Sequence, residues 1–401
     1  MKKCAIAGAG GRCYHTYAMT FAARFADSIS LEGVYDINPL RSKFYADSIG
    51  GKLRAYDDFD EMLAAIRPDF VVVTTKDGVH HEYIVRALMA GCDVLTEKPI
   101  ATDEAKCAAI LEAERISGRR VTVTFNCRFM PYIAHIKELL NARVVGDILS
   151  VNYEYLLGTP HGSDYFRRWH RLMENSGSLL VHKSTHHFDI CNWLLDDLPQ
   201  TVTALGSLHY YGDKQSRPNH GKRCSDCEIS RECEYYEPFD DEMSRKLYFE
   251  AESADGYHRD ACPFDAEIDI YDNMSVSVRY RRGSILTYQL TTYNPYEAYK
   301  INITGTMGRL EAMEYFTGER AGESDYRIRI YDTKGKLTEH IFPKAAGAHS
   351  GGDDRMIDML FGGAQDTLGQ CAASRDGVAA AMIGICARRS IERGETINIE
   401  L

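Results

Sequence analysis

The stretch GAGGRC, residues 8–13, follows the apolar run CAIA and precedes a helical pattern. It matches the GxGxxG pattern at Gly8 and Gly10, with Cys13 in the third position, where glycine or alanine is usual. Such glycines let the backbone turn tightly and approach a pyrophosphate at the N-terminus of the next helix. Asp36 ends the next apolar run, ~20 residues further on, where a carboxylate bonds the adenine ribose hydroxyls. The order strand, turn, helix, strand, Asp predicts a dinucleotide-binding βαβ unit; an ordinary βα turn with a chance aspartate is the alternative.

The first 125 residues continue this unit by alternating short apolar runs with amphipathic segments. Such alternation is typical of a parallel sheet with helices on both faces. We therefore predict an α/β fold in which residues 1–125 form a Rossmann domain with a doubly wound parallel sheet. Strands are expected at 4–10, 30–36, 70–75, 92–97 and 120–125, and helices at 57–66 and 103–118.

The remaining residues, 126–401, contain longer runs that alternate in period two and are rich in Tyr, Val and Thr. This pattern favours a second, α+β domain with a large, mostly antiparallel open sheet. RRGS at 281–284 is a hairpin signal. We expect strands at 148–157, 201–211, 274–280, 284–293, 299–305 and 396–401, an insertion at 212–265, and helices within 351–393.

Composition excludes several classes of partner. The chain has 401 residues, a formal net charge of -11 and a pI near 5.7. An acidic chain without blocks of Lys and Arg is a poor match for nucleic acid or anionic lipid, so we expect neither. No stretch approaches the ~18 apolar residues of a membrane span. The start, MKKCAIAGAGG, fits a first β-strand better than a signal peptide, because glycines interrupt its short apolar run. A cytoplasmic location with reduced cysteines is expected.

TEKPI, residues 96–100, ends the fifth expected strand at the carboxyl edge of the sheet, where doubly wound folds bind ligands. The following proline restricts the backbone at Lys98, so its amine is held in one direction. Beside an oxidised nicotinamide the charged amine would be disfavoured, which lowers its pKa towards the range useful for proton transfer. The alternative is a surface lysine at the end of a strand.

Together these features resemble the Gfo/Idh/MocA oxidoreductases, a family named after glucose–fructose oxidoreductase, inositol dehydrogenase and MocA. The resemblance implies a Rossmann domain followed by an α/β domain whose open sheet supports the substrate pocket and the contacts of a homodimer or homotetramer. It also implies NAD(P)-dependent oxidation or reduction of a sugar, polyol or glycoside carbon. It rests on GAGGR, Asp36, TTKDGVHHEYIVRALMAGCDVLTEKPIA at 74–101, HHFDICNWLL at 186–195, ITGTMGRLEA at 303–312 and DGVAAAMIGICARRSIERGETINI at 376–399.

The resemblance also suggests a role for VHKSTHHFD, residues 181–189. Without the resemblance, the spacing of its histidines is also compatible with a metal site. In the family the corresponding helix often reads D-x-G-x-H, and its histidine is a catalytic acid–base near the lysine of EKP. His186 takes that position here, and His182 replaces the aspartate. We expect His186 to exchange the proton with a substrate hydroxyl, Lys98 to share that work, and His182 to line the pocket or relay protons. The alternative is that the histidines cap or pack the helix, which we expect for His187.

The cofactor site is expected to favour NAD over NADP, because the carboxylate of Asp36 repels a 2′-phosphate. Arg12 and Arg41 keep NADP as the less favoured alternative. The family's TPN..H loop is TKDGVH here, with Lys76 and Asp77 in place of Pro and Asn. The expected cofactor contacts are Gly8, Gly10, Gly11, Arg12, Asp36, Thr75, His80, Glu97, Lys98 and Asn126.

A carbohydrate pocket is indicated by DYFRRWHR at 164–171, which offers an aromatic plate for a sugar ring and donors for its hydroxyls. A solvated basic turn is the alternative. AHSGGDD at 348–354 places His349 and Asp353 on a glycine-rich loop that either closes over the substrate or caps the next helix. The expected substrate contacts are Arg128, Arg168, Trp169, His170 and Lys183.

Four cysteines of the insertion, Cys224, Cys227, Cys233 and Cys262, begin with a CxxC pair. Such a set in a reducing compartment predicts a structural zinc site that holds a polar segment together. An iron–sulfur cluster, disulfides and free thiols are the alternatives.

These observations lead to one functional hypothesis and two rivals. The chain is expected to be an NAD-dependent oxidoreductase that transfers a hydride between nicotinamide and a secondary carbon of a sugar, polyol or glycoside. The first rival is a redox-neutral glycosidase or anhydro-sugar converter, in which a transient ketone permits elimination or hydration. The second is a non-catalytic NAD-binding sensor.

Overall fold

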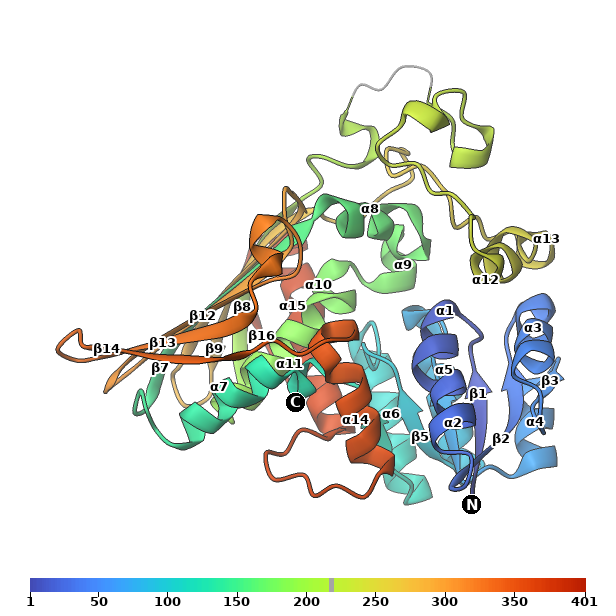
Figure 1. Cartoon of the computed structure of the whole chain (residues 1–401), viewed down its shortest axis with the longest axis horizontal. Coiled ribbons are helices and arrows are strands. Elements are labelled where there is room, and N and C mark those ends of the chain that lie inside the picture. The colour runs from blue at the N-terminus through green and yellow to red at the C-terminus, as the bar shows by residue number, and fades with distance from the viewer. Residues whose placement is uncertain (216–219) are drawn as a thin grey trace.

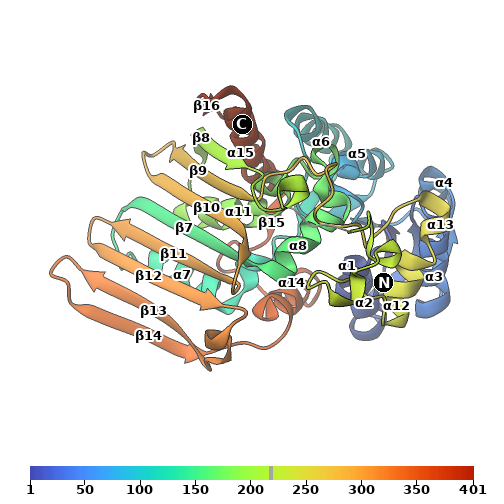
Figure 2. The same cartoon turned by 90° about the horizontal axis from the view of Figure 1, so that it is seen from above.

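The structure is a computed structural model that describes residues 1–215 and 220–401; residues 216–219, inside the expected insertion, lie outside the described part. The chain folds into two β-sheets, each with helices packed against it (Figure 1). Figure 2 shows the larger sheet beside the N-terminal unit, with its helices on one side. None of the helices in the described residues has the length and hydropathy of a membrane span.

The first sheet confirms the predicted Rossmann fold. Its strands lie in the order β15-β6-β5-β4-β1-β2-β3, and all pair in parallel except β15, which is antiparallel to β6. The order changes direction at β1, so the carboxyl ends of β1 and β4 flank the crevice where doubly wound sheets bind ligands. The strands are β1 Lys2–Ala7, β2 Ile29–Tyr35, β3 Arg54–Tyr56, β4 Phe70–Val73, β5 Asp93–Thr96, β6 Val121–Val123 and β15 Ala372–Ala373.

The helices of this unit start where the sequence supplies caps. Asn38, Asp58 and Asp103 each accept a backbone N–H of the first turn of α3, α4 and α6. Two strands of this sheet were not predicted: β3 is short and largely polar, and β15 comes from the far end of the chain. The helices are α1 Gly11–Cys13, α2 Met19–Arg24, α3 Pro39–Ile49, α4 Phe59–Ile66, α5 His80–Met89 and α6 Glu104–Ser117, with a π-helical turn Tyr14–Ala18 joining α1 to α2.

The second sheet has the order β14-β13-β12-β11-β7-β10-β9-β8-β16 and confirms the mostly antiparallel prediction. Only β7 and β10, at its centre, pair in parallel. Side chains alternate between buried and exposed along β9 and β10, so one face is covered by helices and the other is open. The strands are β7 Ile148–Gly158, β8 Pro199–Ser207, β9 Asn273–Tyr280, β10 Ile285–Asn294, β11 Ala298–Gly305, β12 Gly308–Tyr315, β13 Asp325–Asp332, β14 Leu337–Pro343 and β16 Ile397–Asn398.

Helices on the covered face carry the histidine segment. Every residue of α11 is buried, and α11 packs against α15, which itself lies on strand β8 of the sheet (Figure 2). A Cβ at Gly384 of α15 would lie 2.2 Å from the carbonyl oxygen of Leu180, so glycine permits this close packing. The helices are α7 Pro131–Asn141, α8 Thr159–Arg167, α9 Met173–Ser176, α10 Leu179–His182, α11 Ser184–Leu195, α14 Gly352–Phe361 and α15 Ser374–Arg393.

Two later segments return to the Rossmann unit. Helix α14 packs on it, and the ring of Phe361 lies 5.0 Å from that of Phe21. The insertion leaves the end of the second sheet and passes over to α1 and α3, where α12 Glu242–Ser244 and α13 Glu252–Asp255 lie (Figures 1 and 2). The two halves of the chain are thus interlocked, which places elements from both around one crevice.

Candidate active site

The glycine-rich turn is held by the carboxylate that follows β2. A Cβ at Gly8, where φ is +100°, would lie 2.6 Å from the backbone of Thr74, so the turn requires glycine. The backbone N–H of Ala9 donates to Asp36 Oδ2 at 2.7 Å, and that of Asn38 donates to Oδ1 at 2.8 Å. The predicted turn and the predicted ribose carboxylate therefore meet in space.

This turn fits a dinucleotide. Gly10 and Gly11 present no side chain, and the N–H of Gly11 lies at the start of α1, where such folds bind a pyrophosphate. Asp36 stands at the end of β2, in position for the ribose hydroxyls. Arg41 is paired with Asp255 at 2.8 Å and lies 3.7 Å from Asp36. The two carboxylates pair with Nη1 of Arg41, whereas its buried Nη2 has no hydrogen-bond partner among the described residues, so the preference for NAD rests on Asp36.

A second network joins the cofactor side to the loop before α14. Arg12 donates to Glu97 at 2.8 Å and pairs with Asp353 at 2.7 Å. Asn126 and His349 also contact Asp353, each at 2.8 Å. Although burial opposes ionisation, His349 and Arg12 hold the pKa of Asp353 well below its ordinary value. This loop, for which the sequence allowed either closure over the substrate or capping of the next helix, is therefore bonded to two predicted cofactor residues, Arg12 and Asn126.

Lys98 lies at the carboxyl end of β5, beside α10. Its Nζ donates to the backbone oxygen of His182 at 2.8 Å and lies 3.3 Å from Nε2 of the same residue. Burial lowers the pKa of Lys98 to about 8, although the carboxylates of Asp77 and Glu97 oppose that shift. An amine with this pKa exchanges protons readily near neutral pH.

His182 connects this amine to a buried carboxylate. Its Nδ1 lies 2.5 Å from Oδ2 of Asp77, and both residues are buried. Burial, and then the charge of Lys98, lowers the pKa of His182 well below its ordinary value. A neutral imidazole that donates from Nδ1 to Asp77 leaves Nε2 as an acceptor for Lys98. Asp77, His182 and Lys98 thus form a chain in which a carboxylate orients an imidazole, an arrangement suited to moving a proton.

Further histidines surround this chain. The ring of His170 lies 4.2 Å from that of His182 and stacks on Trp169 at 3.7 Å. The ring of His186 packs edge-on against Phe125 at 6.0 Å. The Nδ1 atoms of His170 and His186 are buried and find no hydrogen-bond partner among the described residues. Such orphaned atoms are expected where a ligand supplies the missing partner.

A polar network that the sequence did not predict lies at the end of β7 and on α8. Glu297 accepts from Tyr155 at 2.6 Å and lies 3.1 Å from Nδ1 of His161, whose Nε2 lies 3.0 Å from the hydroxyl of Tyr165. The ammonium of Lys183 lies 5.1 Å above the ring of Tyr155. The available signal was the spacing of four between His161 and Tyr165, which puts both on one face of a helix. Glu297 lies too far along the chain for a local pattern.

Two predicted substrate contacts are engaged by the protein itself. Arg128 forms a buried pair with Asp189, with bonds of 2.7 and 2.5 Å, and so stabilises the start of the second domain. Arg168 pairs with Asp164, one helical turn earlier, at 2.5 Å. Arg128 has its donors directed at the core, so its contact with substrate stays a prediction that this geometry does not favour.

Two other histidines have structural partners. His80 has one ring nitrogen 2.8 Å from the carbonyl oxygen of Pro99 and the other 2.9 Å from that of Thr75, so it joins the loop after β4 to the segment of Lys98. His187 contacts the hydroxyl of Tyr288 at 2.8 Å and packs in the core, as the sequence interpretation expected.

The four cysteines of the insertion have free, half-buried thiols. Burial raises the pKa of Cys262, and the other three thiols raise it further, which places all four in one neighbourhood. Among the described residues, however, no three His, Cys, Asp or Glu side chains are arranged to hold a metal ion. The zinc site therefore stays a prediction.

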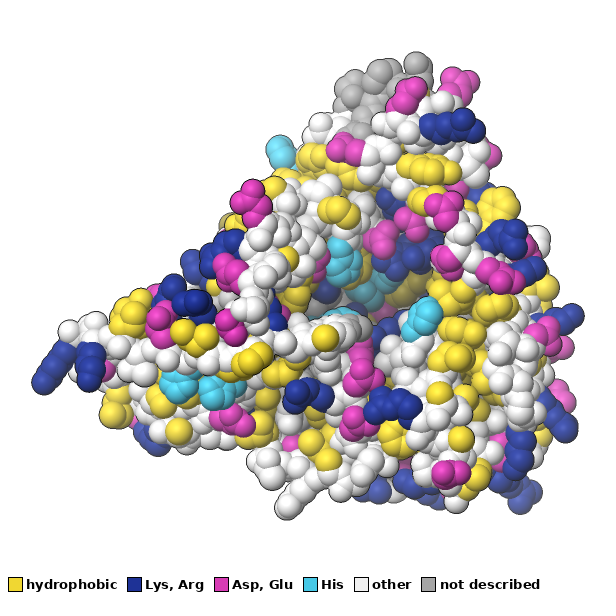
Figure 3. Space-filling view, in the orientation of Figure 1, with side chains coloured by type: hydrophobic (Ala, Val, Ile, Leu, Met, Phe, Trp, Pro, Cys, Tyr) yellow, Lys and Arg dark blue, Asp and Glu magenta, His cyan; other side chains and the backbone are white. Residues whose placement is uncertain are grey.

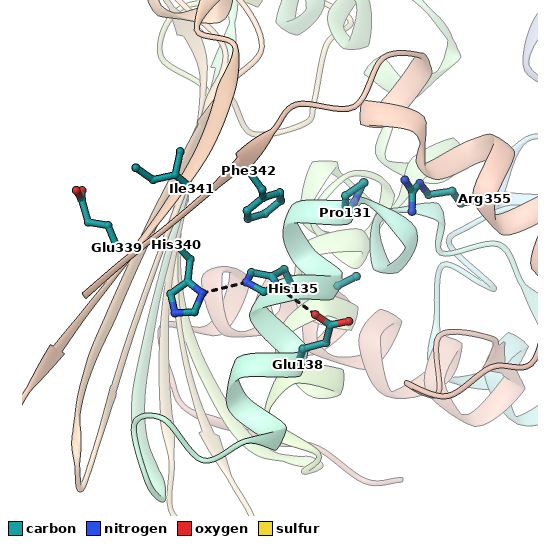
Figure 4. Close-up of a pocket in the computed structure, with 9 residues that line it drawn as sticks. Pro131, His135, Glu138, Glu339, His340, Ile341, Phe342 and Arg355 are labelled. Carbon is teal, nitrogen blue, oxygen red and sulfur yellow. Dashed lines mark hydrogen bonds and ion pairs between the residues drawn. The ribbon is translucent and has the colours of Figure 1, made fainter. Parts of the chain in front are cut away.

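Histidine side chains line part of a hollow at the centre of the molecule. Figure 3 shows histidine side chains beside basic and acidic ones in this hollow, below the insertion. A separate cavity of about 630 Å³ lies between α7 and β14, where His135 and His340 are 3.3 Å apart (Figure 4). No predicted site residue lines that second cavity.

A parallel sheet with a glycine-rich turn, a carboxylate after β2 and a proton-exchanging lysine at its carboxyl edge defines a dinucleotide-dependent enzyme. Comparison with known families makes this specific. A model described as an oxidoreductase family with an NAD-binding Rossmann fold matches residues 2–125, and its C-terminal alpha/beta domain matches residues 137–399. The chain belongs to the Gfo/Idh/MocA oxidoreductase family.

Individual relatives agree with this family. An oxidoreductase of Bacillus subtilis named YteT is 35% identical over 90% of this chain and 89% of its own length. An inositol 2-dehydrogenase of Gluconacetobacter diazotrophicus is 36% identical over 32% of this chain and 36% of its length. An Agrobacterium radiobacter oxidoreductase in complex with NAD+, L-tartaric acid and magnesium shares the fold, with a TM-score of 0.67, 17% identity and coverage of 99% of this chain and 98% of that one.

Proposed function

We propose that this oxidoreductase transfers a hydride between NAD and a secondary carbon of a sugar, polyol or glycoside. The observation that carries the proposal is the chain Asp77–His182–Lys98 at the carboxyl edge of the parallel sheet, beside the glycine-rich turn. When bound, NAD supplies the group that accepts or returns the hydride.

Side chains of the protein accept or donate the proton that accompanies the hydride. Lys98, with a pKa of about 8, takes the proton of the reacting hydroxyl in its amine form, and neutral His182, oriented by Asp77, accepts a hydrogen bond from that amine and positions it. His186 shares the exchange, because its buried Nδ1 has no partner among the described residues and it lies in the first turn of α11, directly after α10 with His182. Water is kept away by the complete burial of α11 and by the rings of Trp169 and His170.

A carbohydrate suits the remaining groups. Trp169 and His170 form a stacked aromatic surface, the ring of Tyr165 packs edge-on against His170 at 5.4 Å, and Lys183, above the ring of Tyr155, is a further donor. Sugar rings bind to such sites through an apolar face on an aromatic side chain and through hydroxyls on polar groups. The names of the inositol dehydrogenases among the relatives support the same class of substrate.

The test is the absorbance of NADH when the purified chain meets NAD and a panel of pyranosides and polyols, with sugar products analysed in the same samples. We expect NADH to appear together with a keto product for one class of substrate. Absence of both NADH and altered sugar across the panel, with NAD bound, would favour a sensor.

The network of Glu297, His161 and Tyr165 supports a redox-neutral cycle as the alternative. Glu297, His161 and Tyr165 add ionisable groups that a simple dehydrogenation does not need. Elimination or hydration next to a transient ketone requires a second acid–base group, because a proton leaves the carbon beside the oxidised one. The same experiment distinguishes the two, since this cycle alters the sugar without net NADH.

We also propose that the four insertion cysteines bind zinc, that the chain acts in the cytoplasm and that it forms a homodimer or homotetramer. The proximity of the four thiols supports the first point, and all twelve cysteines being free supports a reducing compartment. Apolar side chains on the open sheet support self-association, since Leu205 and Ile285 are 76% and 44% exposed.

A further inference from the structure

One part of the insertion, residues 242–260, lies directly on the glycine-rich turn. The backbone N–H of Gly11 donates to the hydroxyl oxygen of Tyr248 at 2.8 Å. A Cβ added at Gly11 would lie only 3.1 Å from that oxygen. Figures 1 and 2 both show α12 and α13 beside α1 and α3, so the contact belongs to a larger docking of the segment.

The segment is fastened to the start of α3, just after the ribose carboxylate. Arg41 donates from Nε to the backbone oxygen of Leu247 at 2.8 Å and pairs through Nη1 with Asp255 at 2.8 Å. Asn38, which is fully buried, donates from its amide to the backbone oxygen of Ala251 at 2.7 Å. None of these bonds uses the N–H groups of the turn, so a dinucleotide bound at the turn leaves them intact.

A cation of the same segment points to an anionic ligand. The guanidinium of Arg259 lies 4.5 Å from the centre of the Tyr248 ring. Its side chain is 18% exposed, and its carboxylate contact, with Glu237, is long at 3.7 Å. That contact is made by Nε itself, which is buried, lies beyond hydrogen-bond distance of Oε1 of Glu237 and has no hydrogen-bond partner among the described residues. A mostly buried guanidinium with an unused donor is costly unless an anion completes its contacts.

We propose that residues 242–260 complete the dinucleotide site: Tyr248 and Arg259 bind the pyrophosphate, and the Arg41–Asp255 pair keeps the segment closed over it. The hydroxyl oxygen of Tyr248 accepts the N–H that a phosphate oxygen accepts in such turns. With the cofactor bound, the hydroxyl yields that N–H and donates its own proton to the phosphate, and Arg259 supplies the positive charge. The proposal rests on the proposed function, in which NAD is the cofactor. It adds that NAD enters and leaves the site beneath a cover formed by residues 242–260.

The test measures how fast NADH binds to and leaves the full-length chain, from its fluorescence in a stopped-flow instrument. Asp255→Asn weakens the fastening, so we expect both rates to rise by about fivefold with a smaller change in Kd. Arg259→Met removes a charge from the pyrophosphate, so we expect about tenfold weaker binding and a smaller dependence on salt. Tyr248→Phe should speed dissociation. Asp240→Asn, an exposed carboxylate of the same insertion, is the matched control and should change nothing.

Each outcome decides the proposal. Unchanged rates for Asp255→Asn together with unchanged affinity for Arg259→Met would overturn it while leaving NAD binding intact. Tighter binding by Tyr248→Phe would also overturn it, because the hydroxyl would then block the site rather than serve it. If the unaltered chain binds no NADH at all, both the proposed function and the proposed cover are wrong. If it binds NADH but the variants change nothing, only the cover is wrong.

Discussion

Lys98 shows how one residue is adjusted by burial and charge acting in opposite directions. Removal from water disfavours its ammonium form, while the carboxylates of Asp77 and Glu97 favour it. Burial has the larger effect, so the pKa of Lys98 falls to about 8. The same carboxylates have other partners, since Asp77 meets His182 and Glu97 meets Arg12. The lysine is therefore a group whose charge changes within the working pH range.

This residue predicts a pH dependence for substrate oxidation. The amine form takes the proton, so kcat/KM should rise with pH and reach half of its plateau near pH 8 in the free enzyme. Asp77→Asn removes a charge that favours the ammonium, so the pKa of Lys98 falls further and the midpoint moves to lower pH. The measurement is a profile of kcat/KM against pH for both proteins. A midpoint that stays in place or moves upwards would count against the assignment.

Two of the departures from the family pattern contact each other. Asp77 stands where the family's loop has asparagine, and His182 stands where its helix has aspartate. Nδ1 of His182 lies 2.5 Å from Oδ2 of Asp77. The two substitutions together therefore keep a carboxylate in this pair and move it from the helix to the loop.

This contact predicts a coupled pair of variants. His182→Asp alone places two carboxylates together in a buried site, which should lower kcat by about a hundredfold. Adding Asp77→Asn removes the repulsion and should restore at least about tenfold of that loss. The four proteins of the cycle are compared by kcat and by thermal unfolding. If the double variant is as poor as the sum of the single ones, the two residues do not act together.

At the scale of elements, helices α10 and α11 owe their position to close packing on α15. Gly384 lets the carbonyl of Leu180 approach, two residues before His182. Gly384→Ala would force the two helices apart, so we expect a loss of about 1–3 kcal/mol in the free energy of unfolding and a lower kcat. Gly322→Ala is the control, because its added Cβ meets nothing within 4 Å. Denaturant unfolding of both variants checks this, and equal stability would refute the packing argument.

The insertion offers a second prediction at this scale. If its four cysteines hold zinc, metal analysis of the purified chain should find about one zinc per chain. Replacing Cys224 and Cys227 by serine should release it and make the insertion more sensitive to proteolysis. Full resistance to proteolysis without bound metal would show that the thiols act only as packing residues.

Much at the scale of elements and residues was predictable from the sequence. Apolar periodicity located the five core strands of the first sheet, and GAGGRC, Asp36 and Lys98 marked its carboxyl edge. The short polar strand β3 and the returning strand β15 were not predicted, because neither carries an apolar pattern of its own. The Asp77–His182 bond and the docking of Tyr248 on Gly11 join residues more than a hundred positions apart. No local pattern encodes such contacts.

For the whole molecule, interlocking of the two halves creates the site. The Rossmann sheet provides the glycine-rich turn and Lys98, while the second domain provides the histidines and the Glu297 network. The insertion crosses from the second domain to the first and contacts the turn itself. The two matches to the family model, over residues 2–125 and 137–399, accordingly cover both halves of the chain.

The most direct test of hydride transfer follows a label. The chain is incubated with NAD and pyranosides or polyols that carry deuterium on their secondary carbons, and the NADH is analysed by mass spectrometry. We predict one deuterium in each NADH formed, and a rate ~10²–10⁴ times lower for Lys98→Met, with Lys52→Met, an exposed lysine, unchanged. NADH without deuterium, or full activity of Lys98→Met, would contradict the account.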